Sequence, residues 1–368
     1  MRKSTPVLIF TVAIATATFF SCQKNKNITT IDSPGTEVLE MPAVPYEYFT
    51  FSGGQKANQK AALGRVLFYD KHLSINNTVS CASCHKQAFA FADNVAFSRG
   101  FENKLTGRNS MPLENLPGQF GFGGPINLFW DGRSTSLEDL ILRPVNNHVE
   151  MGISDLSTLP DKLSGLSYYA ELFETAYGDN EITLERISES MASFVESITA
   201  NQSKFDLVQM ELATLSGQEQ YGLTLFDSKY NCRSCHTLAP TIYYGGLGSA
   251  TFVNIGLDAV AKDRGAGAVS GNTADDGKFR IPNLHNIAIT GPYMHDGRFT
   301  TLEQVIDHYS HGINTSPSLD PRLKDVNGNA MRMNISADEK AALIAFLNTL
   351  TDTKMITDPK FSNPFKIR

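Results

Sequence analysis

Apolar residues recur at helical spacing in several stretches of the chain, and this pattern predicts a mostly α-helical protein. Amphipathic helices place an apolar residue every three or four positions, so that one face can be buried. In the last of these stretches we expect Ser336 to cap the helix and Glu339 to complete a capping box. The expected helices cover residues 56–70, 137–142, 183–212, 217–226, 302–309 and 337–350.

Segments with the strict alternation of apolar and polar residues that marks a β-strand are few and short. The segments 115–126 and 262–279 are instead long and rich in glycine or proline. Loops of that length usually serve a function, and here we expect them to wrap around a large bound group. The predicted fold class is therefore all-α, with long functional loops.

The start of the chain has the pattern of a secretory signal. Basic residues at positions 2 and 3 precede an apolar run from Pro6 to Phe20, which is shorter than the about 20 residues of a membrane span. Cys22 stands where a bacterial lipoprotein signal places its lipidated cysteine; the alternative is ordinary cleavage that leaves a free thiol. We expect a signal peptide at 1–21, lipidation of Cys22, a flexible tether at 22–45, and a lipid anchor to a bacterial membrane in the periplasm.

Two Cys-x-x-Cys-His pentapeptides carry the strongest chemical signal. They span residues 81–85 and 232–236, and this pattern is the attachment site for c-type haem. The two thiols form thioethers to the porphyrin vinyl groups, and the histidine supplies the proximal ligand of the iron. We therefore predict two covalently bound haem c groups. Their attachment residues are Cys81, Cys84, Cys232 and Cys235, and their iron ligands are His85 and His236.

Other uses of a Cys-x-x-Cys pair fit less well. Four-thiol zinc sites usually place their two pairs about 15–20 residues apart, whereas roughly 150 residues separate these two. A thioredoxin-like redox pair requires a βαβ unit, and neither motif has one around it. Four of the five cysteines belong to the haem motifs and one to the signal, so no disulfide is expected.

The charge of the chain restricts its partners. Residues 1–21 contain two basic and no acidic residues, so their removal changes the formal net charge from −6 to −8. A mildly acidic surface argues against nucleic acid as a partner, and it suits pairing with a basic redox protein.

The second half of the chain repeats the first in outline. The length of the chain also exceeds what one core usually holds. We therefore expect two cytochrome c-like haem domains related by internal duplication, at 46–205 and 206–355, followed by a tail at 356–368. The matching segments are residues 64–68 and 222–226, 108–113 and 280–284, and 130–133 and 295–298.

Together with the haem motifs, four segments resemble the bacterial dihaem cytochrome c peroxidases and their MauG-type relatives. The resemblance covers the chain from about residue 46 to 351. It implies two unequal haems: a peroxidatic centre of low potential on His85, where peroxide binds, and a centre of high potential on His236, which receives electrons. The four segments are Ala-Phe-Ala-Asp at 90–93, Phe-Trp-Asp-Gly-Arg at 129–133, Val-Glu-Met-Gly at 149–152 and Pro-Tyr-Met-His-Asp-Gly at 292–297.

The resemblance also implies roles for residues outside the motifs. Trp130 matches the tryptophan between the haems, and Glu150 matches the distal acid. Peroxide heterolysis needs a proton moved between the two oxygens, which a carboxylate can do if burial raises its pKa. A calcium ion between the domains would use Asn109 and the carbonyls of Thr290 and Pro292, with water completing its shell of 6–8 oxygens. Read singly, these positions are also compatible with a core aromatic, a loop acid and a turn residue.

Two positions near the expected peroxidatic centre depart from the family pattern. The well-studied peroxidases end a Ser-x-Gly-His motif with a histidine that blocks the iron, and here that segment ends in Phe101. We therefore predict a vacant or water-bound sixth position and peroxide reactivity without reductive activation. Leu140 stands where many relatives have a glutamine that reaches the distal pocket.

A third departure concerns the sixth ligand of the second haem. Tyr309 lies fourteen residues after His295, where the peroxidases have a methionine and the MauG-type enzymes a tyrosine. A phenolate ligand favours ferric iron and lowers the potential. Tyr309 is the preferred candidate, and the identity of the ligand stays open. The alternatives are His308, His311, Met294, Met331 and Met333.

Three functions follow. The first is an exported peroxidase that reduces hydrogen peroxide to water with electrons from a c-type cytochrome or cupredoxin. The second is a MauG-like oxidase of a protein or small-molecule substrate, which Tyr309 and Phe101 favour. The third is a non-catalytic electron carrier. Glu150 and Phe101 argue against it, because a carrier needs both irons six-coordinate and has no use for a distal acid. Family members are often dimers, so a homodimer is a further expected assembly.

Overall fold

The structure is a computed structural model that describes residues 37–42, 46–50, 54–116, 127–238 and 252–367 of the 368-residue chain. The expected signal peptide, the lipidation site Cys22 and most of the expected tether lie outside the described residues. Within these ranges, no helix has the length and apolar character needed to cross a bilayer.

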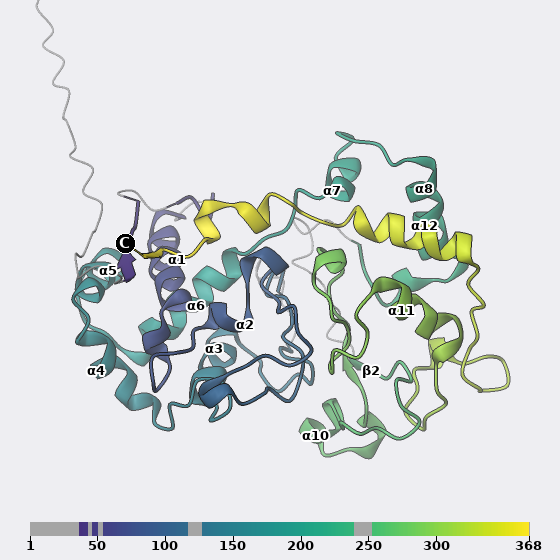
Figure 1. Ribbon diagram of the computed structural model, residues 1–368, viewed down its shortest axis with the longest axis horizontal. Helices are drawn as coiled ribbons and strands as arrows, with labels where there is room; N and C mark the ends of the chain where they lie inside the picture. The colour runs from purple at the N-terminus through teal and green to yellow at the C-terminus, as the bar shows by residue number, and fades with distance from the viewer. Residues whose placement is uncertain (1–36, 43–45, 51–53, 117–126, 239–251, 368) are drawn as a thin grey trace, which may run out of the picture.

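The chain is largely helical and has two halves that lie side by side (Figure 1). In the N-terminal half, α1 (Gly54–Tyr69) packs against α6 (Leu184–Ser197). In the C-terminal half, α8 (Gly217–Thr224) packs against α12 (Ala337–Asn348). The other α-helices are α2 (Cys81–Cys84), α3 (Leu137–Asn146), α4 (Leu159–Ser164), α5 (Ser167–Tyr177), α7 (Lys204–Gln209), α10 (Ala266–Ser270) and α11 (Leu302–Asp307).

Two helices of the C-terminal half continue into a π-helical turn. The turn Leu225–Lys229 follows α8, and the turn His308–Gly312 follows α11. Such turns add one residue to the helical repeat and are common at functional sites. The 3₁₀ turns are Lys71–Leu73, Gln87–Phe89, Phe101–Asn103, Leu156–Thr158, Cys232–Ser234, Thr273–Asp275, Ile287–Ile289, Pro321–Leu323, Met355–Thr357 and Pro359–Phe361.

The helices expected from periodicity are found, with one exception. The capping box at the start of α12 is confirmed: the Glu339 amide donates to Ser336 Oγ at 3.4 Å, and the Ser336 amide donates to Glu339 Oε2 at 3.0 Å. The expected single helix at 183–212 is wrong, because α6 ends at Ser197 and α7 begins at Lys204. Ser203 starts that second helix as a new N-cap, accepting from the Asp206 amide at 3.1 Å.

The all-α prediction is not fully confirmed, because the largely helical fold also contains two small β-sheets. Strand β1 (Glu37–Leu39) pairs antiparallel with β4 (Phe365–Ile367), with Val38 opposite Lys366. Strand β2 (Phe252–Val253) pairs antiparallel with β3 (Phe279–Arg280). Each of these two sheets has two strands.

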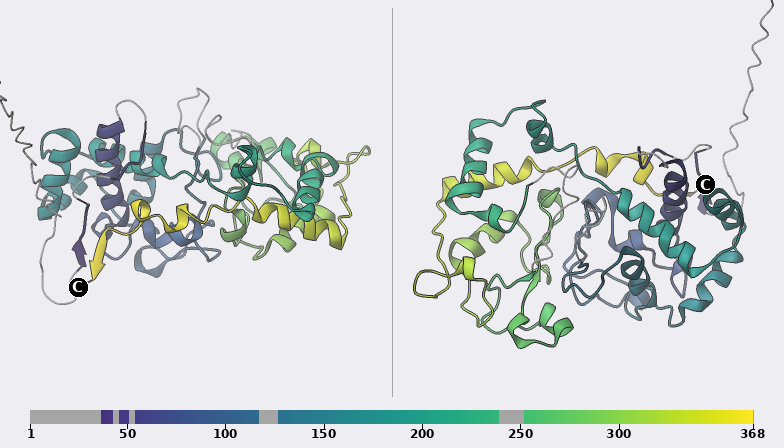
Figure 2. Two further views of the ribbon diagram at one scale, coloured as in Figure 1. Left: turned by 90° about the horizontal axis from the view of Figure 1, so that it is seen from above. Right: turned by 180° about the vertical axis from the view of Figure 1, so that it is seen from behind.

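The sheet of β1 and β4 shows that both described ends of the chain pack on the N-terminal half. After α12 the chain returns from the C-terminal half to the N-terminal half, where its end lies beside β1 (Figures 1 and 2). Leu39 and Met41 at one end, and Met355 and Phe361 at the other, are buried in the N-terminal core. Residues 37–41 therefore pack as part of the fold rather than as a tether, and the segment 356–367 is not a free tail.

Each half has its own buried apolar cluster. In the N-terminal half, Phe68 and Phe91 meet with ring centroids 5.8 Å apart, and the ring of Phe361 contacts Phe91 at 6.1 Å. In the C-terminal half, Phe346 contacts Phe205 and Phe226, each at 5.4 Å. Aromatic pairs at such distances stabilise a core beyond the area they bury.

One glycine in each half allows the main helix pair to approach closely. A methyl group at Gly64 of α1 would collide with the backbone carbonyl of Ser190 in α6. A methyl group at Gly222 of α8 would collide in the same way with the carbonyl of Ala342 in α12. Both glycines stand four residues before a buried phenylalanine and upstream of a haem motif.

Backbone hydrogen bonds and an ion pair join the two halves. The Asn109 amide donates to the His295 carbonyl at 2.7 Å, and the Arg280 amide donates to the Trp130 carbonyl at 2.8 Å. The Arg108 guanidinium contacts Asp263 at 2.7 Å. The segments that the sequence matched between the halves therefore meet at their junction.

Candidate functional site

The first haem motif begins at the short helix α2 in the N-terminal half. Its thiols, Cys81 and Cys84, form no disulfide, and burial raises the pKa of Cys81 to about 12 and that of Cys84 to about 11. Nδ1 of His85 lies 2.7 Å from the Phe91 carbonyl. Because a ring nitrogen held by a carbonyl is the protonated one, Nε2, which lies 3.4 Å from Ser110 Oγ, is the nitrogen with a lone pair for iron.

The second motif repeats this arrangement. Cys232 opens the 3₁₀ turn Cys232–Ser234, and neither it nor Cys235 forms a disulfide. Nδ1 of His236 lies 3.2 Å from the Pro282 carbonyl, which again leaves Nε2 for iron. Burial lowers the pKa of His236 to about 4, so the ring is neutral and able to bind a metal.

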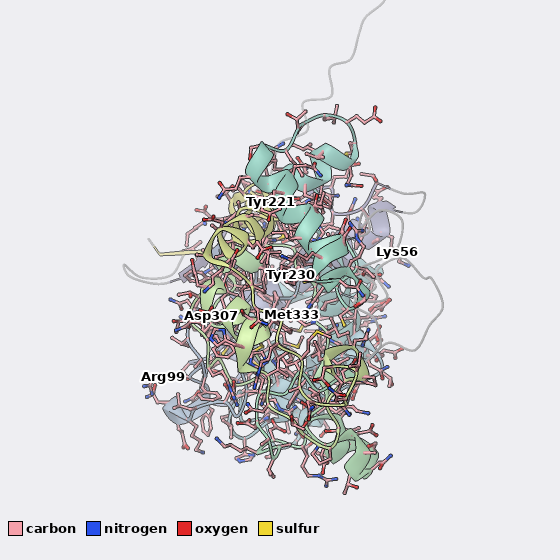
Figure 3. The ribbon with its side chains drawn as sticks, turned by 90° about the vertical axis from the view of Figure 1, so that its right-hand side faces the viewer. Lys56, Arg99, Tyr221, Tyr230, Asp307 and Met333 are labelled. Atoms are coloured by element: carbon pink, nitrogen blue, oxygen red, sulfur yellow. The ribbon has the colours of Figure 1, made fainter. Side chains whose placement is uncertain are left out.

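A cavity of about 540 Å³ adjoins the second motif. This volume lies in the range of about 300–1,000 Å³ typical of cofactor sites. Figure 3 looks onto the C-terminal half, where Tyr230 and Met333, two of the residues that line the cavity, are labelled. Two thiols without a disulfide, a histidine whose Nε2 has no hydrogen-bond partner among the described residues, and an apolar cavity fit a covalently bound haem.

The cavity separates the candidates for the sixth ligand. Tyr309 lines it, from within the π-helical turn His308–Gly312. Burial raises the pKa of the Tyr309 phenol, and the nearby Cys232 and Cys235 act in the same direction. The candidates Met294, Met331 and Met333 also line the cavity.

The two histidines beside Tyr309 are directed elsewhere. Nε2 of His308 lies 2.9 Å from the Ile255 carbonyl, and His308 is not among the residues that line the cavity. His311 is exposed. Tyr309 therefore remains a candidate together with the methionines, whereas the histidines lose support.

Glu150 follows α3 and acts electrostatically on the first motif, where it raises the pKa of both thiols. Burial raises the pKa of the Glu150 carboxyl, against the opposing influence of Arg133. The Asn147 side-chain amide donates to Glu150 Oε1 at 2.9 Å and so fixes the carboxylate. A fixed, half-buried acid next to a haem motif has the properties required of a proton carrier.

Phe101 lies beside this acid. The Phe101 amide donates to the Glu150 carbonyl at 2.8 Å, and the Phe101 ring packs over Gly152. Gly100 has no room for a side chain, because the Val149 carbonyl lies against it. The segment expected to carry a blocking histidine is thus next to Glu150, and it carries a phenyl ring at that position. Leu140, at the other departure, packs on the N-terminal core.

Trp130 lies at the junction of the halves. Its indole N–H donates to the Asn109 carbonyl at 2.9 Å, and its own carbonyl accepts from the Arg280 amide at 2.8 Å. Its side chain reaches the cavity of the second motif. Trp130 therefore lies at the junction and beside the cavity of the second motif, and its place between two haems stays a prediction.

The three expected calcium ligands, Asn109, Thr290 and Pro292, all line the same cavity. The Asn109 side-chain amide donates to the Val95 carbonyl at 3.1 Å, which leaves its oxygen available. Within the described residues, no group of three or more acidic, histidine or cysteine side chains is placed to hold a metal ion. Calcium here would depend on carbonyl and amide oxygens and on water.

Three buried polar residues near the junction were given no role by sequence reasoning. Arg280 and Asn283 line the cavity, and each has a buried nitrogen without a hydrogen-bond partner in the described chain. Glu114 is 2 % exposed, and neither of its carboxyl oxygens has a partner there. The only feature of the sequence that pointed to any of the three was the match between Arg280 and Arg108 in the repeated segments.

Comparisons with known proteins agree with this geometry. The family model for di-haem cytochrome c peroxidase matches residues 58–213. The methylamine utilization protein MauG of Methylorubrum extorquens is 32 % identical over 296 residues, covering 79 % of this chain and 78 % of that protein. The cytochrome c551 peroxidase of Nitrosomonas europaea is 30 % identical over 298 residues, covering 79 % of each chain.

A solved structure shows the same fold. The crystal structure of a MauG-like protein associated with microbial copper homeostasis has a TM-score of 0.71 and 32 % sequence identity, covering 83 % of this chain and 93 % of that one. The sequence identities, the coverage and the two motifs lead to one conclusion: the chain belongs to the dihaem cytochrome c peroxidase family, which includes the MauG proteins.

Proposed function

We propose that the protein is an exported dihaem peroxidase, which reduces hydrogen peroxide to two waters with two protons and two electrons from a c-type cytochrome or cupredoxin. Chemistry takes place at the first motif and electrons enter at the second. The observation that carries this proposal is Glu150: it is half-buried, its pKa is raised by burial, it is held by Asn147, and it lies beside Phe101 in place of a blocking histidine.

When bound, the haem on His85 supplies the iron to which peroxide binds and through which electrons reach it. Glu150 accepts the proton of the inner peroxide oxygen at a carboxylate oxygen and returns it to the outer oxygen, which leaves as water. Asn147 orients the carboxylate for both transfers. Trp130 bridges the halves and shortens the insulating gap for electrons coming from the second motif.

Steady-state peroxide consumption with a reduced c-type donor tests this proposal. We expect turnover by the wild type and its loss in Glu150→Gln; an unchanged rate in the variant would remove Glu150 from the mechanism. Electron paramagnetic resonance of the ferric protein tests the open iron site separately. If the first haem gave only low-spin signals typical of two nitrogen ligands, its sixth position would be occupied. That result would contradict the prediction that Phe101 leaves this position vacant or water-bound.

The second candidate function is a MauG-like oxidase of a protein or small-molecule substrate. The cavity position of Tyr309 favours it, since a phenolate ligand stabilises oxidised iron. Two results together would favour the oxidase function: no peroxide turnover with any reduced donor, and oxidation of a substrate protein whose gene lies next to the gene of this protein. Tyr309→Met should then raise the potential of the second haem and weaken the oxidase reaction.

The remaining parts of the proposal concern location and assembly. Residues 1–21 and Cys22 would direct the protein to the periplasm and anchor it to a bacterial membrane, calcium would bind at Asn109, Thr290 and Pro292, and two copies would form a homodimer. The organisation as two duplicated haem domains, 46–205 and 206–355, is supported by the close approach at Gly64 and Gly222 in matching helix pairs.

A further inference from the structure

The segment 280–284 of the C-terminal half brings buried hydrogen-bond donors to the cavity without acceptors for them. Arg280 is 6 % exposed, and its Nε has no partner in the described chain. Nη2 of its guanidinium donates to the sulfur of Met111 at 3.8 Å, and a thioether sulfur is a weak acceptor. The side-chain nitrogen of Asn283 is also buried without an acceptor, while its oxygen accepts from the His285 amide at 3.0 Å.

Burying a cation without an anion is strongly unfavourable, and buried charges in proteins are paired. Arg280 nevertheless has no acidic side chain in contact among the described residues, and burial lowers its pKa to about 10. The structure thus has a positive charge at the cavity wall whose partner is not part of the described protein.

The other charged residues that line this cavity are neutralised by protein groups. Among the described charged residues of the lining, Arg280 therefore stands out, because its charge is available to an anionic ligand in the cavity. The neutralised pairs are Lys229 with Glu339, Asp258 with Arg298 at 2.8 Å, Asp263 with Arg108 at 2.7 Å, and Asp320 with Arg322 at 2.8 Å.

We propose that Arg280, assisted by Asn283, binds the propionate carboxylates of the haem attached at the second motif. The proposal rests on the dihaem function given above. The haem presents two carboxylates, which arginine binds through its planar array of donors. Pro282, whose carbonyl holds His236 at 3.2 Å, lies between the two donors, so one short segment would orient the proximal ligand and hold the propionates.

The same residue joins the propionates to the electron path. The Arg280 amide donates to the Trp130 carbonyl at 2.8 Å, so a shift of the 280–284 segment is transmitted to the tryptophan between the halves. Arg280 is therefore a positioning residue that sets the charge around the second haem.

The test is the reduction potential of the second haem, measured by spectroelectrochemistry from pH 5 to 9 without peroxide or donor. In the wild type the paired propionate stays ionised, and we expect little dependence on pH. In Arg280→Gln the propionate titrates within this range, so the potential should fall as pH rises, with the redox equilibrium shifting by up to about tenfold per pH unit. Arg280→Lys should restore most of the wild-type behaviour.

Arg264→Gln is the matched control, because Arg264 is exposed in the same half and already paired with Asp276 at 2.7 Å. A curve for Arg280→Gln that runs parallel to the wild type overturns the proposal. A crystal structure of the haem-loaded wild type decides the matter even if that variant does not fold. A propionate oxygen within about 4 Å of the guanidinium supports the proposal, and its absence overturns it.

Haem content separates this proposal from the function on which it rests. Two haems per chain, normal peroxide turnover and an unaffected potential in Arg280→Gln would overturn the role of Arg280 alone. One haem per chain, attached only at the first motif, would overturn both.

Discussion

The two haem-attachment segments are alike around their histidines and different in the residues that face them. His85 and His236 each direct Nδ1 to a backbone carbonyl, at 2.7 Å and 3.2 Å. Glu150 and Phe101 accompany the first, whereas Tyr309 accompanies the second. The scaffold around the histidine is therefore shared by the two halves, and the proposed function assigns their different chemistry to a few side chains away from the motif.

The arginines at matching positions show the same division. Arg108 in the N-terminal half contacts Asp131 at 2.6 Å and Asp263 at 2.7 Å, so protein carboxylates balance its charge. Arg280 in the C-terminal half has no such partner among the described residues. One arginine closes the junction between the halves, and the other is left for a ligand.

The largest effect is expected where the two sites differ most. In the proposed mechanism, Glu150→Gln removes the group that carries a proton between the peroxide oxygens, and general acid–base groups of this kind contribute about 10²–10⁴-fold. We expect peroxide turnover to fall by that factor, while both haems remain attached and the second is still reduced by the donor. Stopped-flow absorption at the two haems measures this directly.

Glu174→Gln serves as its control, because Glu174 is an exposed acid on α5 in the same half. It should leave peroxide turnover unchanged. Equal losses in the two variants would mean that the first site does not depend on Glu150, and the proposed asymmetry between the sites would fail.

The second prediction concerns the junction that fixes the two sites relative to each other. Burial raises the pKa of Glu114 to about 8, while Asn286 beside it acts in the opposite direction. At acidic pH both folded and unfolded chains hold the proton. As pH rises from about 4.5 to 8, only the unfolded chain loses it, so the free energy of unfolding decreases by about 1.4 kcal/mol per unit of pKa difference. Above pH 8 this decrease stops.

Glu114→Gln should remove this pH dependence. The free energy of unfolding of the variant minus that of the wild type should therefore be a few kcal/mol larger at pH 8 than at pH 4.5. Denaturant unfolding followed by far-ultraviolet circular dichroism at a series of pH values measures it. Parallel stability curves for the two proteins would show that Glu114 ionises normally in the folded state.

The third prediction tests how far the halves are built alike. Gly64→Ala and Gly222→Ala each force a methyl group against a backbone carbonyl of the partner helix. Overpacking of this kind costs about 1–3 kcal/mol, and we expect both variants to lose stability by similar amounts. Gly107→Ala, at a position with open space, provides the control for each thermal unfolding experiment. A loss at only one glycine would indicate that the helix pairs are not equivalent.

The sequence predicts what depends on local pattern. The period of apolar residues marks α3 and α6 most clearly, and the Ser336–Glu339 pair marks where α12 begins. It cannot reveal that β1 pairs with β4, because that contact joins residues more than three hundred positions apart. Nor does it show the π-helical turns after α8 and α11, since one added residue breaks the period that identifies a helix.

The candidate site divides in the same way. The haem-binding cysteines and histidines are adjacent in the chain, so their spacing alone identifies them. Glu150 and Trp130 required a resemblance, because a single acid or tryptophan has many structural uses. Arg280 and Asn283 became visible only in three dimensions, since what distinguishes them is the lack of a partner within the described fold.

The smallest effect is expected from the support of Glu150, the proposed distal acid. Asn147 donates to Glu150 Oε1 at 2.9 Å, and a donor to a carboxylate stabilises its ionised form. Asn147→Ala should therefore raise the pKa of Glu150 further and lower peroxide turnover about tenfold, equivalent to about 1.4 kcal/mol. Because the proton-accepting form is the carboxylate, the acid limb of the pH–rate profile should move to higher pH. A tenfold loss without that movement would show that Asn147 acts on the loop backbone, where its Oδ1 accepts from the Val149 amide at 2.8 Å, and not on the carboxylate.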